Sequence, residues 1–143
     1  MSSFINPVDY DASIHEEILA AITRNDPTVI ELAEDMAIQE MAGYLSQRYD
    51  CDQIFAETDD LRNKLILMFA IDITLYHLHC AHNPQRFPKN RQDRYDRAIA
   101  WLQEVQKGRV IPSGLQLKIN NEGNQGGGAT FSIIGNPKRG THF

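Results

Sequence analysis

Hydrophobic residues dominate one long stretch of this chain, residues 61–81, which reads LRNKLILMFAIDITLYHLHCA. An unbroken apolar run fills positions 65–71, and further apolar residues follow to position 78. A helix that is apolar on every side must be covered by other helices or by lipid. A membrane span needs about 18 nearly uncharged residues, whereas Arg62, Lys64 and Asp72 place charges in this stretch. We therefore expect the central helix of a soluble bundle, with no membrane contact.

Two amphipathic stretches precede the central one. Ser13 and Glu16 have the spacing of a capping box, and apolar positions 14, 18, 19 and 22 predict a short helix that ends near Thr23. Asp26-Pro27 is a favourable helix start. A second helix is predicted over residues 27–49, and its apolar stripe contains Val29, Ala33, Met36, Ala37, Met41, Tyr44 and Leu45.

The segments around these helices lack a sustained period. Residues 1–12 are expected to be an extended lead-in with a turn at Asn6-Pro7. Residues 50–58 are expected to be a loop anchored by Ile54 and Phe55.

A last helix is predicted over residues 90–107 and ends at Gly108, a common C-terminal residue. From position 110 the pattern changes to alternation: Leu115, Leu117 and Ile119 form one candidate strand, and Phe131 and Ile133 form another. The polar, glycine-rich residues 120–128 form the loop between them. An isolated hairpin is marginal in water, so an ordered arm is expected to need a neighbouring surface.

The sequence therefore predicts a mainly α chain, a small helical bundle with three long helices and one short N-terminal helix. The bundle domain is expected to cover residues 1–112. Residues 113–143 are expected to form a C-terminal β-hairpin or a flexible arm.

Composition narrows the function classes. A chain of 143 residues with 42% hydrophobic and 23% charged residues is ordinary for one globular domain. Its net charge of −5 argues against a free-standing nucleic-acid binder. The N-terminus has no basic region followed by an apolar one, so no secretory signal is expected. Cys51 and Cys80 are expected to be free thiols in a reducing cytoplasm.

The best candidate for a metal site is the end of the central stretch, where His77, His79 and His82 accompany Cys80. His79 and His82 share a helical face, but His77 points elsewhere, so a zinc site would lack ligands. Histidines at the negative end of the helix dipole, with Asp59 and Asp60 at the positive end, are the preferred reading. The chain also lacks a phosphate-loop motif and a nucleophile elbow. We expect no enzyme, no metal and no cofactor.

One basic strip stands out in this acidic chain, and it comprises Arg86, Lys89, Arg91, Arg94 and Arg97. One reading is a solvated face in which Asp93 pairs with Arg97 four residues later. The other is a subunit interface or a contact with passing DNA. Trp101, one turn after Arg97, is a candidate for stacking on its guanidinium.

Four short strings resemble the phage Mu Gp36-like family of small phage and prophage head proteins. They are GYLSQRY at 43–49, the stretch 65–76 with its Ala-x-Asp-Ile core at 70–73, Arg94-Tyr95 with residues 98–102, and KGRV at 107–110. The resemblance covers residues 4–117. The glycine-rich hairpin and tail lie beyond the point where such proteins are expected to finish, and residues 51–60 lack the expected prolines.

The resemblance implies a non-enzymatic virion assembly protein, a head-tail connector or head-completion subunit. Its implied partners are itself, in an oligomeric ring, the portal and tail-side connector proteins, and passing DNA. Its implied place is the bacterial cytoplasm during assembly and the head-tail junction of the virion. The expected interface residues are Tyr44, Arg48, Arg91, Arg94, Arg97, Leu115, Leu117, Ile119, Phe131 and Ile133.

Two other function classes remain open from the sequence. One is a small helical adaptor or nucleic-acid-contacting module that uses the basic strip. The other is a metal-dependent enzyme built on Asp72, His79 and His82.

Overall fold

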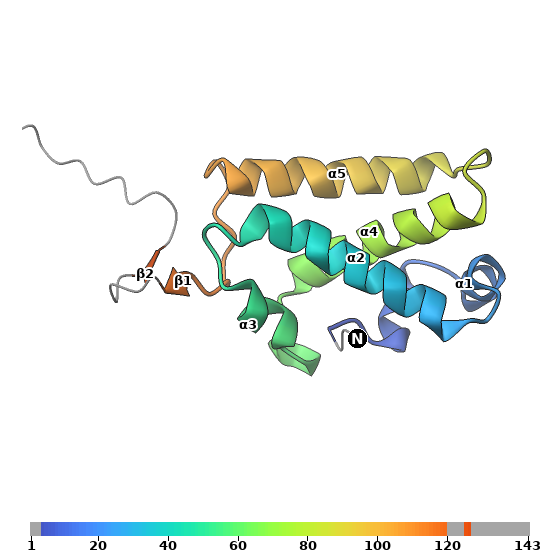
Figure 1. Ribbon diagram of the computed structural model, residues 1–143, viewed down its shortest axis with the longest axis horizontal. Coiled ribbons are helices and arrows are strands. Elements are labelled where there is room, and N and C mark those ends of the chain that lie inside the picture. The colour runs from blue at the N-terminus through green and yellow to red at the C-terminus, as the bar shows by residue number, and fades with distance from the viewer. Residues whose placement is uncertain (1–3, 120–124, 127–143) are drawn as a thin grey trace, which may run out of the picture.

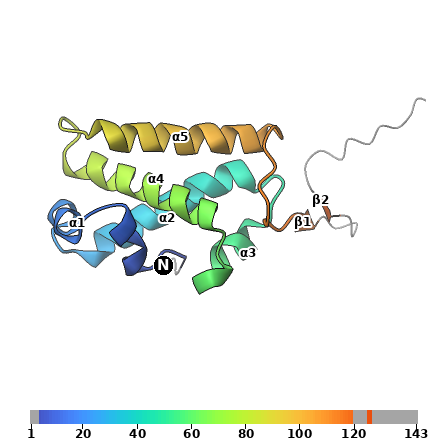
Figure 2. The same cartoon turned by 180° about the vertical axis from the view of Figure 1, so that it is seen from behind.

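The computed structural model describes residues 4–119 and 125–126, and it confirms the mainly α fold. Three long helices are present, α2 (Pro27–Leu45), α4 (Lys64–His82) and α5 (Lys89–Gln106), together with the short α1 (Glu16–Thr23). α5 lies along the top of Figure 1, and α2 crosses in front of α4. Seen from behind, α4 lies in front of α2 (Figure 2). α4 therefore packs against both other long helices.

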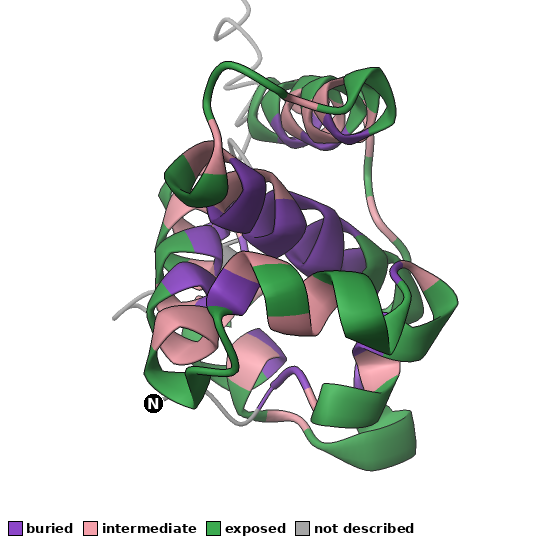
Figure 3. Ribbon diagram, turned by 90° about the vertical axis from the view of Figure 1, so that its right-hand side faces the viewer, coloured by how far each residue is buried: buried purple, intermediate pink, exposed green. Residues whose placement is uncertain are grey.

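α4 supplies much of the core. Asn63 begins it by accepting hydrogen bonds from the backbone amides of Leu65 and Ile66 at 3.0 and 3.1 Å. Buried positions face the other helices (Figure 3), and on α4 they include Ile66, Leu67, Phe69, Ala70, Ile71, Ile73, Leu75 and Leu78. By length and hydropathy α4 passes as a membrane span, a test that core helices also pass, and more than half of its most apolar stretch is buried in the bundle.

The start of this helix differs from the prediction. α4 begins at Lys64 and not at Leu61, and Asp59 and Asp60 lie before it in a separate 3-10 turn, η2 (Asp59–Leu61). Leu65 and Met68 are also more than one-third exposed, so the other helices do not cover α4 on every side.

The N-terminal lead-in is not extended as predicted. Residues Pro7–Ala12 form a 3-10 helix, η1, and the backbone amide of Asn6 donates to Asp9 Oδ2 at 2.7 Å. The capping box predicted at Ser13 is wrong, because α1 begins at Glu16 with His15 as its uncapped N-terminal neighbour. Arg62 fixes η1 in place by donating to the Phe4 carbonyl and to Asp9.

The predicted loop at residues 50–58 contains a helix, α3 (Cys51–Ala56). Asp50 accepts a hydrogen bond from the Gln53 amide at 3.2 Å. Ile54 is buried, and the Phe55 ring meets the Phe4 ring edge-on with centroids 5.2 Å apart. The predicted apolar anchor is therefore present, but a helix this short is too brief to show a period.

The C-terminal segment begins against the bundle. α2 ends at Leu45, earlier than predicted. The residues that follow it pair antiparallel with the C-terminal segment: Asp50 N donates to Gln116 O, and Lys118 N donates to Arg48 O, both at 2.9 Å. The bridge joins Tyr49 and Leu117. The predicted boundary at residue 112 stays a prediction.

Two short strands follow, β1 (Lys118–Ile119) and β2 (Gln125–Gly126), and they pair antiparallel beyond the end of the bundle (Figure 1). β2 lies in the stretch that was expected to be loop. The strand expected at Phe131 and Ile133 lies outside the described residues.

Candidate interaction surface

A buried carboxylate on α4 organises the basic strip. The side chain of Asp72 has no exposed surface. Arg94 Nη1 donates to its Oδ1 and Arg97 Nη2 to its Oδ2, each at 3.3 Å. Arginines three residues apart share a helical face, which lets α5 present both to α4. Since a carboxylate taken out of water needs opposite charge and hydrogen bonds, these two arginines hold α4 and α5 together.

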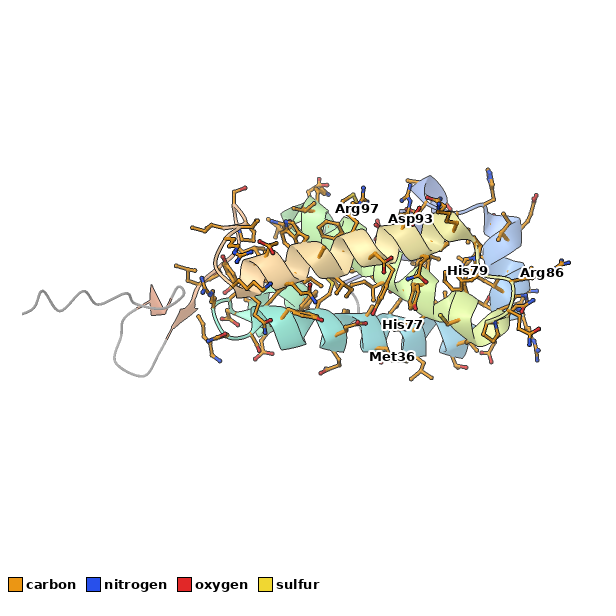
Figure 4. The ribbon with its side chains drawn as sticks, turned by 90° about the horizontal axis from the view of Figure 1, so that it is seen from above. Met36, His77, His79, Arg86, Asp93 and Arg97 are labelled. Atoms are coloured by element: carbon orange, nitrogen blue, oxygen red, sulfur yellow. The ribbon has the colours of Figure 1, made fainter. Side chains whose placement is uncertain are left out.

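The other three cations of the strip point to different places. Arg91 is buried and donates to the Ser13 carbonyl. Burial lowers the pKa of its guanidinium, and the nearby Arg94 acts in the same direction. Arg86 and Lys89 are exposed, and Figure 4 shows Arg86 at one end of the molecule, away from Arg97. The structure therefore does not gather the five cations on one surface.

The aromatic contact predicted for Arg97 goes to a different ring. Its guanidinium lies over Phe69, 5.8 Å from the ring centroid. Trp101 instead packs on Phe69 with centroids 5.0 Å apart. Phe69 on α4 thus lies in contact with both residues, which the spacing along α5 alone could not reveal.

The other predicted interface residues within the described part of the chain come from the end of α2, from the residues just after it and from the C-terminal segment. Tyr44, Leu115 and Leu117 are half-buried and pack against the core. The Arg48 guanidinium lies so close to Gly108 that a Cβ on that glycine would be 2.5 Å from Nη1. Ile119 belongs to β1. Arg48, whose carbonyl accepts from the Lys118 amide, and Leu117, which is bridged to Tyr49, therefore lie at the junction between the bundle and the C-terminal segment.

His77 links α4 to α2, whereas His79 bonds within α4. Glu40 Oε2 lies 2.9 Å from His77 Nε2, and Glu40 Oε1 accepts from the Tyr95 hydroxyl at 2.6 Å. The ring of Tyr76 stacks on Tyr95 with centroids 3.7 Å apart. His79 Nδ1 lies 2.8 Å from the Leu75 carbonyl, and burial lowers the pKa of its imidazole. Within residues 4–119 and 125–126, no group of three His, Cys, Asp or Glu is arranged to hold a metal.

Two exposed apolar pairs were missed by the sequence reasoning. Met36 was assigned to the buried stripe of α2, but it is 46% exposed, and Leu32 one turn earlier is 63% exposed. On α4, Leu65 and Met68 are 39% and 37% exposed. Leu32 and Met36 each come one position before a buried alanine, Ala33 or Ala37. That offset is the signal in the sequence that could have assigned them to a different face of α2.

The chain matches the family described as Bacteriophage Mu, Gp36 over residues 5–130. This chain belongs to the phage Mu Gp36 family. Searches of curated proteins and of solved structures gave no match. Membership of the Gp36 family indicates a phage structural or morphogenesis protein.

The family match also corrects one expectation. It continues to residue 130, so the glycine-rich segment after Lys107-Gly108 is largely part of the family region and not an addition to it.

The strings that carry the resemblance contact one another in pairs in this Gp36-family fold. Arg48, from the string at 43–49, lies against Gly108, from the string at 107–110. Asp72, from the Ala-x-Asp-Ile core, binds Arg94, from the Arg-Tyr string. These motif residues thus fix how α5 sits on the rest of the bundle.

Proposed function

We propose that this Gp36-family protein is a head-tail connector or head-completion subunit, which forms a homo-oligomer docked at the head vertex of a phage. Its partners would be further copies of itself, the portal and tail-side connector proteins. The proposed role is geometric and non-enzymatic: the bundle is a rigid wedge, and the C-terminal segment joins it to a neighbouring subunit.

The observation that supports this role is the junction of the C-terminal segment with the bundle. Backbone pairing of Arg48 and Asp50 with Lys118 and Gln116 fixes where that segment begins. Leu115 and Leu117 pack on the core just before it. Beyond the junction, β1 lies past the end of the helices (Figure 1). Because β1 is already paired with β2, the strand that a neighbouring chain would extend by backbone pairing, a common mode of association, is β2.

The test is deletion of this chain from a host that carries the phage, with induction and electron microscopy of the particles. Mass spectrometry of intact wild-type particles determines whether the chain is a component. Tailless or DNA-leaking heads, with the chain present in wild-type particles, support the proposal. Normal particles that lack the chain contradict it.

A truncation separates the role of the segment from that of the bundle. A chain that ends at Ile119 keeps Leu115, Leu117 and their backbone pairing, so its helicity should equal that of the full chain. We expect it to be lost from particles. Full incorporation of the truncated chain would remove the segment from the mechanism.

The alternative, a nucleic-acid-contacting adaptor that uses the basic strip, has less support. Three of the strip's five cations make hydrogen bonds within the chain, those of Arg91, Arg94 and Arg97. DNA binding that falls steeply with salt and is lost in Arg86→Ala plus Lys89→Ala would favour this alternative.

A further inference from the structure

One face of α2 is exposed and uncharged along its length. Thr28, Leu32, Met36, Gln39 and Gly43 recur at intervals of three or four residues, so they form one stripe of the helix, and all five are exposed. We call this set the α2 stripe. Figure 4 shows Met36 on the side of the molecule opposite Arg97.

Gly43 leaves room for another chain to approach this stripe closely. Glycine inside a helix costs stability relative to alanine, and a Cβ at Gly43 would meet no atom within 4 Å. Neither the backbone, which is helical here, nor a neighbouring side chain in the described part of the molecule requires glycine. Close contact with another chain would require it.

A second apolar patch lies on α4. Leu65 and Met68 are three residues apart and therefore neighbours on one helical face, which continues to Asp72 four residues after Met68. Arg97 binds Asp72 and covers Phe69, so this face of α4 is next to Arg97. Arg97 itself lies on the side away from Met36 (Figure 4). We call Leu65 and Met68 the α4 patch.

The charges beside the two surfaces are opposite. α2 contains no lysine or arginine, and Glu31 and Asp35 flank its stripe. Lys64 and Arg97 flank the α4 patch, with side chains 66% and 55% exposed. Lys64 makes an exposed ion pair with Asp60 at 3.7 Å, which competes weakly with a new partner. Arg94 and Arg97 together exceed the charge of Asp72 by one, although Asp93 lies on α5 one turn before Arg97.

We propose that the α2 stripe of one copy of this chain docks on the α4 patch of a second copy. The two surfaces are different and lie on opposite sides of the molecule, so the contact is head to tail. Such a contact leaves one free surface at each end of a dimer, and repetition closes a ring when the rotation permits. This interface rests on the proposed function, since it supplies the subunit contact that a connector ring needs.

Single cysteines test the geometry. In a chain with Cys51→Ser and Cys80→Ser, one variant carries Met36→Cys and a second, differently tagged, carries Met68→Cys. The variants are oxidised in two settings, at high protein concentration and in phage particles. In both we expect a disulfide-linked dimer when the two variants are mixed, and none when either variant is oxidised alone. A matched control replaces Met68→Cys by Ile111→Cys, since Ile111 is 80% exposed and outside both surfaces.

Each result decides the question. Three outcomes would overturn the interface. They are a link between two copies of the same variant, a mixed product no stronger than that of the Ile111 control, and no product in either setting. Chain that is absent from particles, while the mixed link still forms, would contradict the proposed function and leave the interface standing.

Charge reversal gives a second measurement that keeps the native cysteines. Glu31→Lys and Lys64→Glu should each lower the sedimentation-derived association constant, and the double variant should restore it. Equal losses in single and double variants would contradict the pairing. Loss of salt-dependent DNA binding in Lys64→Glu, with association unchanged, would assign the Lys64 side to nucleic acid.

Discussion

The guanidinium of Arg48 lies over Gly108, where a Cβ would be 2.5 Å from Nη1 and 2.7 Å from Nη2. Gly108 also has a φ of +81°, in the left-handed region that favours glycine. It follows the last residue of α5 by two positions, so the C-terminal end of this helix and the end of α2 meet at one point. Arg48 brings a positive charge to the negative end of the α5 dipole.

Gly108→Ala should therefore destabilise the fold in two ways. The left-handed backbone costs an alanine about 1–2 kcal/mol, and Arg48 must also move. Gly114→Ala is the matched control, because Gly114 has a φ of +78° but its nearest atom is 3.8 Å from the added Cβ. Urea denaturation should show a larger loss of unfolding free energy for Gly108→Ala. Equal losses would mean that the Arg48 contact contributes nothing.

The Asp72 cluster predicts unequal effects for its two sides. Removing both arginines, with Arg94→Met and Arg97→Met, takes away the two cations that hydrogen-bond the buried carboxylate and should cost about 3–5 kcal/mol. Asp72→Asn should cost less, because both arginines are partly exposed and stay hydrated. Adding Asp72→Asn to the double arginine variant should recover stability. A double-mutant cycle by chemical denaturation measures this coupling, and additive losses would contradict it.

Glu34 predicts a stability change with pH. Burial, together with the charges of Asp35 and Glu31, raises the pKa of Glu34, against the hydrogen bond that the Tyr10 hydroxyl donates at 2.6 Å. Its ionised form is therefore disfavoured in the folded state, and the penalty is present above its folded pKa. Glu34→Gln keeps an acceptor for Tyr10 and should raise the unfolding temperature at pH 7. This gain should shrink as pH falls through the folded pKa and vanish below the usual glutamate range.

Asp9 provides the opposite case. Burial opposes ionisation of Asp9, but hydrogen bonds from Arg62 and from the Asn6 amide outweigh it and lower its pKa. Its stabilisation is present above the unfolded aspartate pKa and is lost as pH falls through the folded pKa. Asp9→Asn should therefore lower the unfolding temperature at pH 7 and have no effect in strong acid. Thermal scans across pH measure both effects, and a rise for Asp9→Asn or a fall for Glu34→Gln at pH 7 would contradict the assignment for that residue.

Gly43→Ala should stabilise the isolated chain. The added Cβ meets nothing within 4 Å, and alanine is favoured over glycine in a helix interior by up to about 1 kcal/mol. We expect a higher unfolding temperature in dilute solution. A lower one would show that Gly43 has a role inside the subunit.

The amino-acid sequence by itself determined the three long helices and the family. A period of 3.6 residues, Pro27 at a helix start and an unbroken apolar run are local signals, so α2, α4 and α5 were predicted to within a few residues. The family strings are equally local, since each is read along the chain. These local signals do not show which distant residues are in contact. α3 and η1 were missed for this reason, because both are short and are held by long-range contacts, Phe4 with Phe55 and Asp9 with Arg62.

Only the tertiary structure decided the roles of the charged and exposed residues. In the sequence, Arg94 and Arg97 form a basic strip, but the fold places a buried carboxylate from α4 beneath them. Met36 fits an apolar helical period, yet α4 and α5 cover a different face of α2 and leave it exposed. The physical reason is that periodicity fixes the direction of a side chain around its own helix. Which direction is buried depends on where the other helices lie, and that is a property of the packed molecule.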